Sequence, residues 1–265
     1  METGWMTAAG LGIGLLLCCI PAIAGFVLIQ IKYRKSVLPF FMGAAAFIVS
    51  QLLLRTPLLQ LVLPRFQWYV AMSVQNYYGY WIFLGMTAGI FEETARWICF
   101  RYLLKKRRRF SDGIVFGLGH GGAEALLITG IGYLNNFIVA WVLAGGGNLT
   151  QSFGIEEPLA SQIAQQFQQL TFLGSMAGAV ERILALTMHV GFTMIVFYGV
   201  KRGKSLPALL AAIAAHGIID ASIGFWQAAG VTGWALEGIF AVYTAALVVW
   251  VFICYKKLSK EEREA

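Results

Sequence analysis

The stretch Gly89-Ile90-Phe91-Glu92-Glu93-Thr94-Ala95-Arg96-Trp97 holds two carboxylates and a guanidinium within an otherwise apolar segment. On membrane-insertion scales each such residue costs about 2.5–3.5 kcal/mol at the centre of a transmembrane helix. A chain that keeps three of them together must recover that free energy. Either the charges pair with one another for structural reasons, or they serve a chemical purpose.

The composition around this stretch is that of a helical membrane protein. Of 265 residues, 58% are hydrophobic and only 12% are charged, whereas soluble domains carry about 25% charged residues. The apolar residues form long runs of the length that a membrane-crossing helix needs. We therefore expect an all-α bundle, one integral membrane domain over residues 1–265, located in the bacterial cytoplasmic membrane.

Seven transmembrane spans fit the apolar runs and the basic residues between them. Lysines and arginines cluster at 32–35, 105–109 and 201–204. Placing these runs on the cytoplasmic side puts the N-terminus outside and the C-terminus inside. The spans are expected at residues 8–31, 38–54, 77–104, 112–136, 172–200, 206–225 and 234–255.

The stretches between these spans should lie at the membrane surface or outside it. Residues 55–70, with two prolines and several aromatic residues, suit an outer interfacial segment. The apolar run 137–143 is too short to cross alone, and 144–169 suits an outer loop with a surface helix. A charged tail begins at Lys256. The first apolar run follows an acidic Glu2 and is too long for a signal-peptide core, so we expect a membrane helix there.

The net charge of +7 is not interpreted as nucleic-acid binding, because the basic residues cluster at the ends of apolar runs. We expect no nucleic-acid partner. The four cysteines show neither metal-type spacing nor a disulfide framework and are interpreted as packing residues. They are Cys18, Cys19, Cys99 and Cys254.

The chain has three histidines, and all three fall inside expected spans at the same depth as Glu92. Glu92, His120, His189 and His216 each lie about 11–13 residues from the nearest basic run. At 1.5 Å rise per residue this is roughly 16–20 Å, near the centre of a hydrocarbon core about 30 Å thick. Four ionisable residues from four helices at one depth predict a shared site.

Spacing along each helix suggests partners within this layer. Glu92 and Arg96 are four residues apart and can pair on one face, whereas Glu93 points about 100° away and can face a different neighbour. The same four-residue spacing joins two histidine–carboxylate pairs, His120 with Glu124 and His216 with Asp220.

Carboxylate and imidazole groups offer two kinds of hydrolytic chemistry. A buried glutamate beside a histidine can act as a general base toward water, and further imidazoles can donate hydrogen bonds to an oxyanion. The same side chains could hold zinc, although the helical His-Glu-x-x-His pattern is absent. We therefore expect a site without a cofactor and keep zinc as an alternative. No serine or cysteine in the layer has an evident base, so a nucleophilic triad is not supported.

These residues resemble the glutamic-type intramembrane proteases of the CAAX prenyl endopeptidase (Abi) superfamily. The likeness is greatest to its YhfC-like branch of membrane peptidases, which is also related to the seven-span scaffold subunit of gamma-secretase. The superfamily pattern is Glu-Glu followed by an arginine, then Phe-x-x-x-His, then His-x-x-x-Asn or Asp. Here it is found as Glu92-Glu93-Thr94-Ala95-Arg96, Phe116-Gly117-Leu118-Gly119-His120 and His216-Gly217-Ile218-Ile219-Asp220. His189 matches an additional histidine of some branches, and the likeness covers residues 77–225.

The resemblance implies hydrolysis of a peptide bond in a membrane-embedded or lipid-modified substrate. Glu92 or Glu93, with His120, would activate water, while His216 with Asp220 would stabilise the oxyanion. Arg96, Phe116 and Glu124 would support the site. The arginine follows the second glutamate after two residues instead of the usual three. An ionised Asp220 would repel an oxyanion, so it must be protonated or serve only to orient His216.

Three other interpretations remain open from the sequence. The charges could be a buried ion pair that fixes helix register, and the histidine pairs could be interhelical hydrogen bonds. The whole chain could then be a scaffold subunit without catalytic activity. A proton- or ion-coupled transporter is the third possibility, but the broken helices typical of such proteins are not evident.

Overall fold

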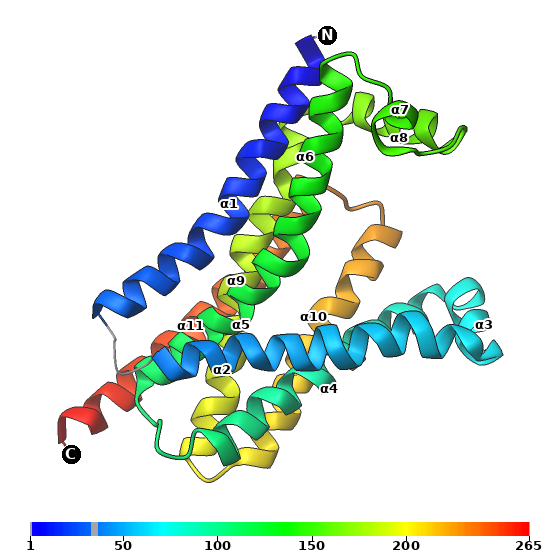
Figure 1. The fold of residues 1–265 in the computed structure, drawn as a ribbon. Helices are drawn as coiled ribbons and strands as arrows, with labels where there is room; N and C mark the ends of the chain where they lie inside the picture. The colour runs from blue at the N-terminus through cyan, green and yellow to red at the C-terminus, as the bar shows by residue number, and fades with distance from the viewer. Residues whose placement is uncertain (1, 33–36, 265) are drawn as a thin grey trace. The chain divides into compact units, whose positions relative to one another are not determined.

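A computed structural model describes residues 2–32 and 37–264, all of which form helices or short connections without a β-strand. Figure 1 shows the helices coloured by residue number. The chain divides into two compact units. Unit 1 comprises Met1–Pro21 and Ala125–Ile183, and unit 2 comprises Ala22–Glu124 and Leu184–Ala265. Of the first expected basic run, 32–35, residues 33–35 lie outside the described part of the chain.

The prediction of a polytopic helical membrane protein is confirmed. Six helical stretches of the described chain are long and apolar enough to cross a bilayer. Helix α4 (Tyr77–Ile98) lies outside this set, and it is the helix with the acidic stretch. The count of seven and the orientation stay predictions. The six stretches are Gly4–Ile29, Val37–Arg65, Phe110–Ala144, Phe172–Lys201, Ser205–Ala228 and Trp234–Leu258.

Two predicted helix ends are wrong. Helix α2 (Val37–Phe47) continues through π-helical turns and a final 3-10 turn to Arg65, so Pro57 does not end it and only α3 (Gln67–Gln75) is a separate helix. Helix α5 (Phe110–Glu124) likewise continues through η6 (Ala125–Gly130) into α6 (Ile131–Ala144). Asparagines 135 and 136 are polar, but they keep the backbone donors that a helix needs, so polarity alone does not stop it.

The C-terminal part also differs from the expectation. Helix α11 (Trp234–Glu264) runs on beyond Lys256, where a charged tail had been predicted. The expected outer loop does contain helices, α7 (Leu149–Phe153) and α8 (Leu159–Gln169), as the prediction of a surface helix required.

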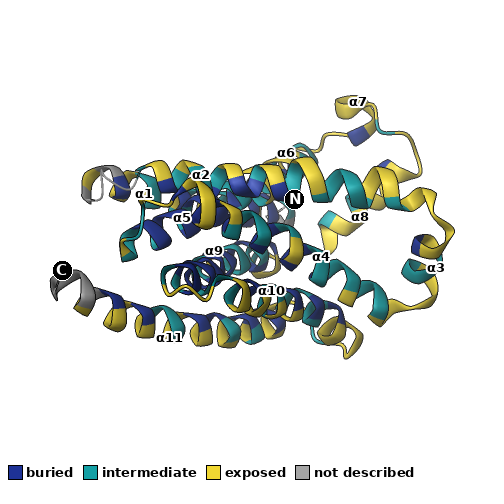
Figure 2. Cartoon of the chain, turned by 90° about the horizontal axis from the view of Figure 1, so that it is seen from below, coloured by how far each residue is buried: buried dark blue, intermediate teal, exposed yellow. Residues whose placement is uncertain are grey.

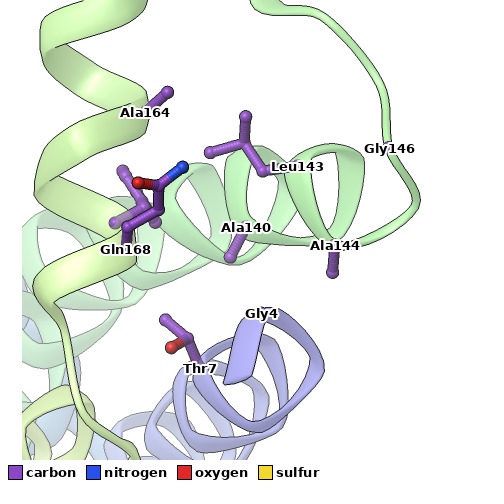
Figure 3. Close-up of a pocket in the computed structure, with 9 residues that line it drawn as sticks. Gly4, Thr7, Ala140, Leu143, Ala144, Gly146, Ala164 and Gln168 are labelled. Atoms are coloured by element: carbon purple, nitrogen blue, oxygen red, sulfur yellow. The ribbon is translucent and has the colours of Figure 1, made fainter. Parts of the chain in front are cut away.

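Unit 1 packs the start of α1 (Glu2–Lys32) against α6 and the α8 region. Ala8, Leu11 and Ala140 form its buried core. A pocket of about 400 Å³ lies among α1, α6 and α8 (Figure 3). Small side chains such as Ala140 and Ala164 leave this space, and Thr7 and Gln168 add polar groups to its wall.

Unit 2 is held together by helices that touch through glycine. Helix α4 packs along α10 (Ser205–Ala228), as Figure 1 shows. A Cβ atom on Gly89 would lie 2.6 Å from the Ile213 carbonyl oxygen, and one on Gly85 would lie 2.6 Å from the Ala221 backbone nitrogen. Because the lower number in α4 meets the higher number in α10, the two helices are antiparallel. Their backbones are in direct contact, as small residues allow in membranes.

Helix α5 also packs through glycine, against α9 (Phe172–Lys201) on one side and α2 on another. Its glycine row faces α9, with Gly113 against Met194 and Gly117 against Val190. On another face, the backbone of α2 approaches α5 closely at Gly119. The third member of the row, Gly121, also contacts α9. The three glycines of this row, spaced by four, thus let α5 pack closely against α9.

An aromatic core lies next to the acidic stretch. Phe100, of π-helical η5 (Cys99–Leu103), packs at a tilt against Phe116 and edge-on against Phe197, with ring centroids 4.7 Å and 5.2 Å apart. All three rings are fully buried. In unit 2, α9 is the most buried helix, whereas α11 leaves much of its surface exposed (Figure 2).

Substitution of Gly89 by alanine tests the direct contact between α4 and α10. The added Cβ must push against the Ile213 carbonyl, so Gly89→Ala should destabilise the protein by about 1–3 kcal/mol, as overpacking does. Thermal unfolding in detergent micelles measures the change.

Gly238→Ala is the matched control, because nothing lies within 4 Å of its would-be Cβ atom. That substitution should be neutral or stabilising by up to about 1 kcal/mol. Equal effects of the two substitutions would contradict the packing described for α4 and α10.

Candidate active site

Four helices of unit 2 bring the predicted polar residues together. The rings of His120 and His189 are 5.1 Å apart between centroids, and those of His189 and His216 are 5.7 Å apart. The residues predicted at one depth thus converge in space. We call the following the buried cluster: Glu92, Glu93 and Arg96 of α4, His120 of α5, His189 of α9 and His216 of α10.

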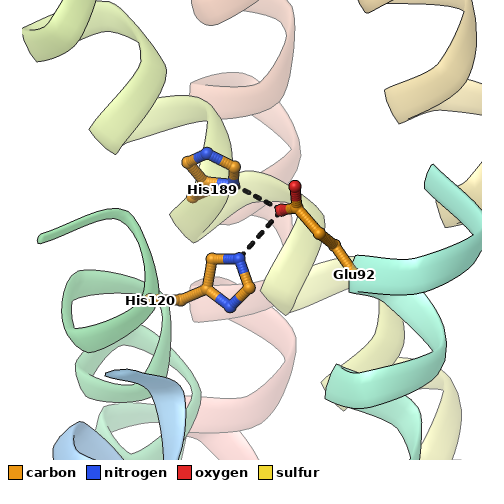
Figure 4. Close-up of side chains that lie close together, drawn as sticks. All are labelled: Glu92, His120 and His189. Atoms are coloured by element: carbon orange, nitrogen blue, oxygen red, sulfur yellow. Dashed lines mark hydrogen bonds and ion pairs between the residues drawn. The ribbon is translucent and has the colours of Figure 1, made fainter. Parts of the chain in front are cut away.

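Glu92 stands between two imidazoles (Figure 4). Its Oε2 atom accepts a hydrogen bond from His120 Nε2 at 2.9 Å and lies 3.9 Å from His189 Nδ1. The Glu92 side chain is 5% exposed and that of His120 is 0% exposed. A carboxylate and two imidazole nitrogens therefore face one another in a site almost closed to solvent.

Arg96 connects the two glutamates with a histidine. Its Nη1 donates to Glu93, and its Nη2 donates to His189 Nδ1 at 2.7 Å and lies 3.5 Å from Glu92 Oε2. The predicted Glu92–Arg96 pair is thus present, but Glu93 is the closer partner. One guanidinium serves two carboxylates, so the histidines must help to compensate the second charge.

His216 is positioned by Glu93 and an aromatic ring. Its Nδ1 donates to Glu93 Oε1 at 2.7 Å, and its ring stacks on Phe192 with centroids 4.6 Å apart. The predicted partner Asp220 is more distant, with Oδ2 3.6 Å from Nε2. The Asp220 side chain is 38% exposed. Asp220 therefore lies at the edge of the site, and Glu93 orients the imidazole.

The predicted pairing of His120 with Glu124 is wrong. Glu124 hydrogen-bonds His189 Nε2 from the neighbouring helix. If that nitrogen carries the proton, Nδ1 has a lone pair directed toward Arg96 and Glu92. A carboxylate behind a histidine fixes its tautomer in this way in many metal sites. Spacing of four along α5 gave the right residues but not their partners.

Three buried polar atoms of the cluster have no hydrogen-bond partner within the part of the chain that the structure describes. They are Glu93 Oε2, Arg96 Nε and His120 Nδ1. A buried polar atom without a partner costs about 1–3 kcal/mol. The cluster therefore keeps donors and acceptors for water, a substrate group or an ion.

Phe116 and Arg55 support the site from outside. Phe116, predicted as a supporting residue, belongs to the aromatic core, and its side chain has no polar atom with which to bind the cluster. Arg55 was missed, because it was assigned to an interfacial segment. Its guanidinium donates to the Leu84 carbonyl at 2.7 Å and to Thr87 Oγ1 at 3.2 Å, which ties the α2 helix to α4. A lone arginine inside an apolar helix was the available signal.

Substitution of Arg96 tests how strongly the buried carboxylates depend on its charge for the stability of the fold. Arg96→Met leaves Glu92 and Glu93 without their cation, so we expect a loss of about 3–5 kcal/mol in the free energy of unfolding. Combining it with Glu92→Gln and Glu93→Gln should recover much of that loss, since no buried charge then remains. Unfolding in micelles provides the measurement.

The exposed Arg101 of η5 offers the control. Arg101→Met should change stability by less than about 0.5 kcal/mol. An equal cost of Arg96→Met with and without the glutamate substitutions would show that the three charges are not coupled.

Comparison with known proteins gives one family and one relative. Residues 16–243 match the family described as YhfC intramembrane metalloprotease. A Bacillus subtilis (strain 168) protein described as uncharacterized membrane protein YhfC is 31% identical over 223 residues, which cover 83% of this chain and 85% of the relative. No solved structure matches. Since the family match covers most of the chain and includes every residue of the buried cluster, this protein belongs to the YhfC intramembrane metalloprotease family.

Proposed function

We propose that this protein is an intramembrane endopeptidase with a metal site at Glu92, His120 and His189, acting on a membrane-embedded or lipid-modified peptide. One observation carries the proposal. One ligand atom from each of these three buried residues lies within 4.8 Å of the others. The description of the family as a metalloprotease supports it. The initial expectation of a site without a cofactor is set aside in favour of the zinc alternative.

The donor set suits zinc. Two imidazole nitrogens and a carboxylate are the ligands of several catalytic zinc sites, which keep a further position for the reaction. Glu124 behind His189 is the supporting carboxylate that such sites commonly have. The Arg96 Nη2 contact with His189 Nδ1 would have to be exchanged for the ion. Arg96 would then retain its pairing with Glu93.

A zinc ion in this position would polarise a peptide carbonyl and favour deprotonation of a water molecule. The chain itself supplies orientation and proton transfer. His216, held at Nδ1 by Glu93, directs Nε2 toward the exposed edge at Asp220, where it can give a proton to a leaving amine. The near-complete burial of Glu92 and His120 keeps bulk water away from the reacting groups.

A metal-free glutamic peptidase is the second candidate. It is favoured by the Glu92–His120 hydrogen bond at 2.9 Å and by the guanidinium that already occupies His189 Nδ1. Glu92 would then take the proton from water, and His216 would stabilise the oxyanion. In this candidate the resemblance of the motifs to those of CAAX prenyl endopeptidases would reflect a shared mechanism. Both candidates use the same residues, and metal analysis separates them.

Elemental analysis of the purified full-length protein tests the metal. We expect about one zinc ion per chain in wild type and none in His120→Ala. Glu124→Gln keeps all three ligands and should weaken zinc binding by about 10–100-fold, because only the orienting carboxylate is lost. A protein free of zinc after purification and after incubation with zinc would contradict the metal site.

Peptide cleavage in proteoliposomes tests the reaction. Wild type should cleave members of a library of single-span peptides, with products identified by mass spectrometry, and Glu92→Gln should lower the rate by about 10²-fold or more. Glu237→Gln, which changes a buried glutamate of α11 outside the cluster, should keep the wild-type rate.

Treatment with a chelator distinguishes the two mechanisms. Activity that is lost and then restored by zinc supports the metallopeptidase, and activity unaffected by the chelator supports the glutamic type. If Glu92→Gln cleaves as fast as wild type, both mechanisms are wrong. Absence of cleavage of the whole library by a folded wild-type protein would favour the scaffold interpretation.

A further inference from the structure

A second polar feature of unit 2 is a pocket that contains none of the residues of the buried cluster. It has a volume of about 490 Å³ and is lined by Leu38 of α2 together with residues 102–107, which end η5 and form the turn after it. One part of its wall is basic, with Lys105, Lys106 and Arg107. The other part is apolar.

The shape of this turn is fixed by its own hydrogen bonds. The Leu104 N–H donates to the Cys99 carbonyl at 2.7 Å, and the Leu104 side chain is fully buried. Arg108 donates to the carbonyls of Phe100 at 2.7 Å and Leu104 at 3.2 Å, so its guanidinium satisfies acceptors that the end of the helix leaves open. The pocket is therefore built by the folded chain and does not depend on flexible side chains alone.

The two lysines of the turn are available to a ligand. Lys105 and Lys106 are both exposed, and neither forms an ion pair with any carboxylate whose side chain the structure describes. Two adjacent ammonium groups create a local positive potential that an anion would lower. Of the three basic residues in the pocket wall, the two lysines are exposed and Arg107 is half-buried.

The apolar part of the wall is exposed as well. Leu38 is 49% exposed, Leu103 61% and Tyr102 52%. The Tyr102 ring rests edge-on against Trp97, with centroids 5.5 Å apart, which limits its movement. Exposed apolar side chains beside a basic run are expected where a membrane helix reaches the lipid headgroups. A ligand with one anionic group and attached hydrocarbon fits both halves of this wall.

We propose that the pocket binds the headgroup of an anionic phospholipid such as phosphatidylglycerol. Lys105 and Lys106 contact the phosphate, while Leu38 and Leu103 contact the first part of the acyl chains. Basic pockets at the ends of membrane helices bind anionic headgroups by this combination of charge and apolar contact. Free inorganic phosphate has no apolar part and would use only the lysines.

Native mass spectrometry of the full-length protein in detergent, with phosphatidylglycerol and phosphatidylcholine added in equal amounts, tests this proposal. Wild type should retain phosphatidylglycerol in preference. The double variant Lys105→Gln/Lys106→Gln should lower its retention by about 10–30-fold, the effect expected for two lysines at a headgroup. Leu103→Ser should also lower retention, because it removes an acyl-chain contact.

Lys256→Gln/Lys257→Gln is the matched control. It removes the same charge from two exposed lysines of α11 that do not line the pocket. This variant should retain phosphatidylglycerol as wild type does. Equal losses in the two double variants would indicate general charge attraction and overturn the proposal.

Two further outcomes would also overturn it. Wild type that retains both lipids equally has no anionic lipid site. Inorganic phosphate that displaces phosphatidylglycerol, with no effect of Leu103→Ser, would assign a phosphate site in place of a lipid site. Because all five substituted residues are exposed, the variants should unfold at the wild-type temperature in detergent micelles, which confirms that they are folded.

Discussion

Burial of two adjacent carboxylates beside a single guanidinium is the constraint on which unit 2 depends. Glu93 and Arg96 are completely buried and Glu92 nearly so. The guanidinium can neutralise one carboxylate, and the other must find its compensation on neighbouring helices. His120 and His216 donate hydrogen bonds to the two carboxylates from α5 and α10, and His189 of α9 accepts one from Arg96. A charge imbalance within one turn of α4 thus requires three other helices to approach the same point.

Those helices can approach because glycine replaces side chains where they touch. Gly89 contacts α10 four residues before Glu93, and Gly117 contacts α9 close to His120. Larger residues would hold the helices apart by the thickness of a side chain, and hydrogen bonds of 2.7–2.9 Å between them could not form. Polar convergence and glycine packing are therefore two parts of one arrangement.

The convergence of Glu92 with the three histidines could be predicted from the sequence, whereas their individual partners could not. The rise of a helix is fixed, so counting from the basic runs placed Glu92 and the three histidines in one layer. Which side chains meet depends on the rotation of each helix about its axis and on its neighbours. For that reason Glu124 was paired with His120 although it contacts His189, and Asp220 was given the role that Glu93 holds for His216. Two helices were predicted to end at 54 and 136, whereas they continue to Arg65 and Ala144. Proline and asparagine did not interrupt the backbone hydrogen bonds there as their usual preferences suggest.

The contact between α4 and α10 has a mechanical consequence. Where two helices meet through side chains, rotamer changes let one helix shift relative to the other. Between Gly89 and the backbone of Ile213 there are no side chains that could change rotamer, so we expect α4 and α10 to move together as one rigid unit. A membrane-embedded peptide substrate of the kind proposed above would therefore be unable to pass between these two helices. It would have to enter between helices that meet through ordinary side chains, and entry there would leave the hydrogen bond between Glu93 and His216 in place.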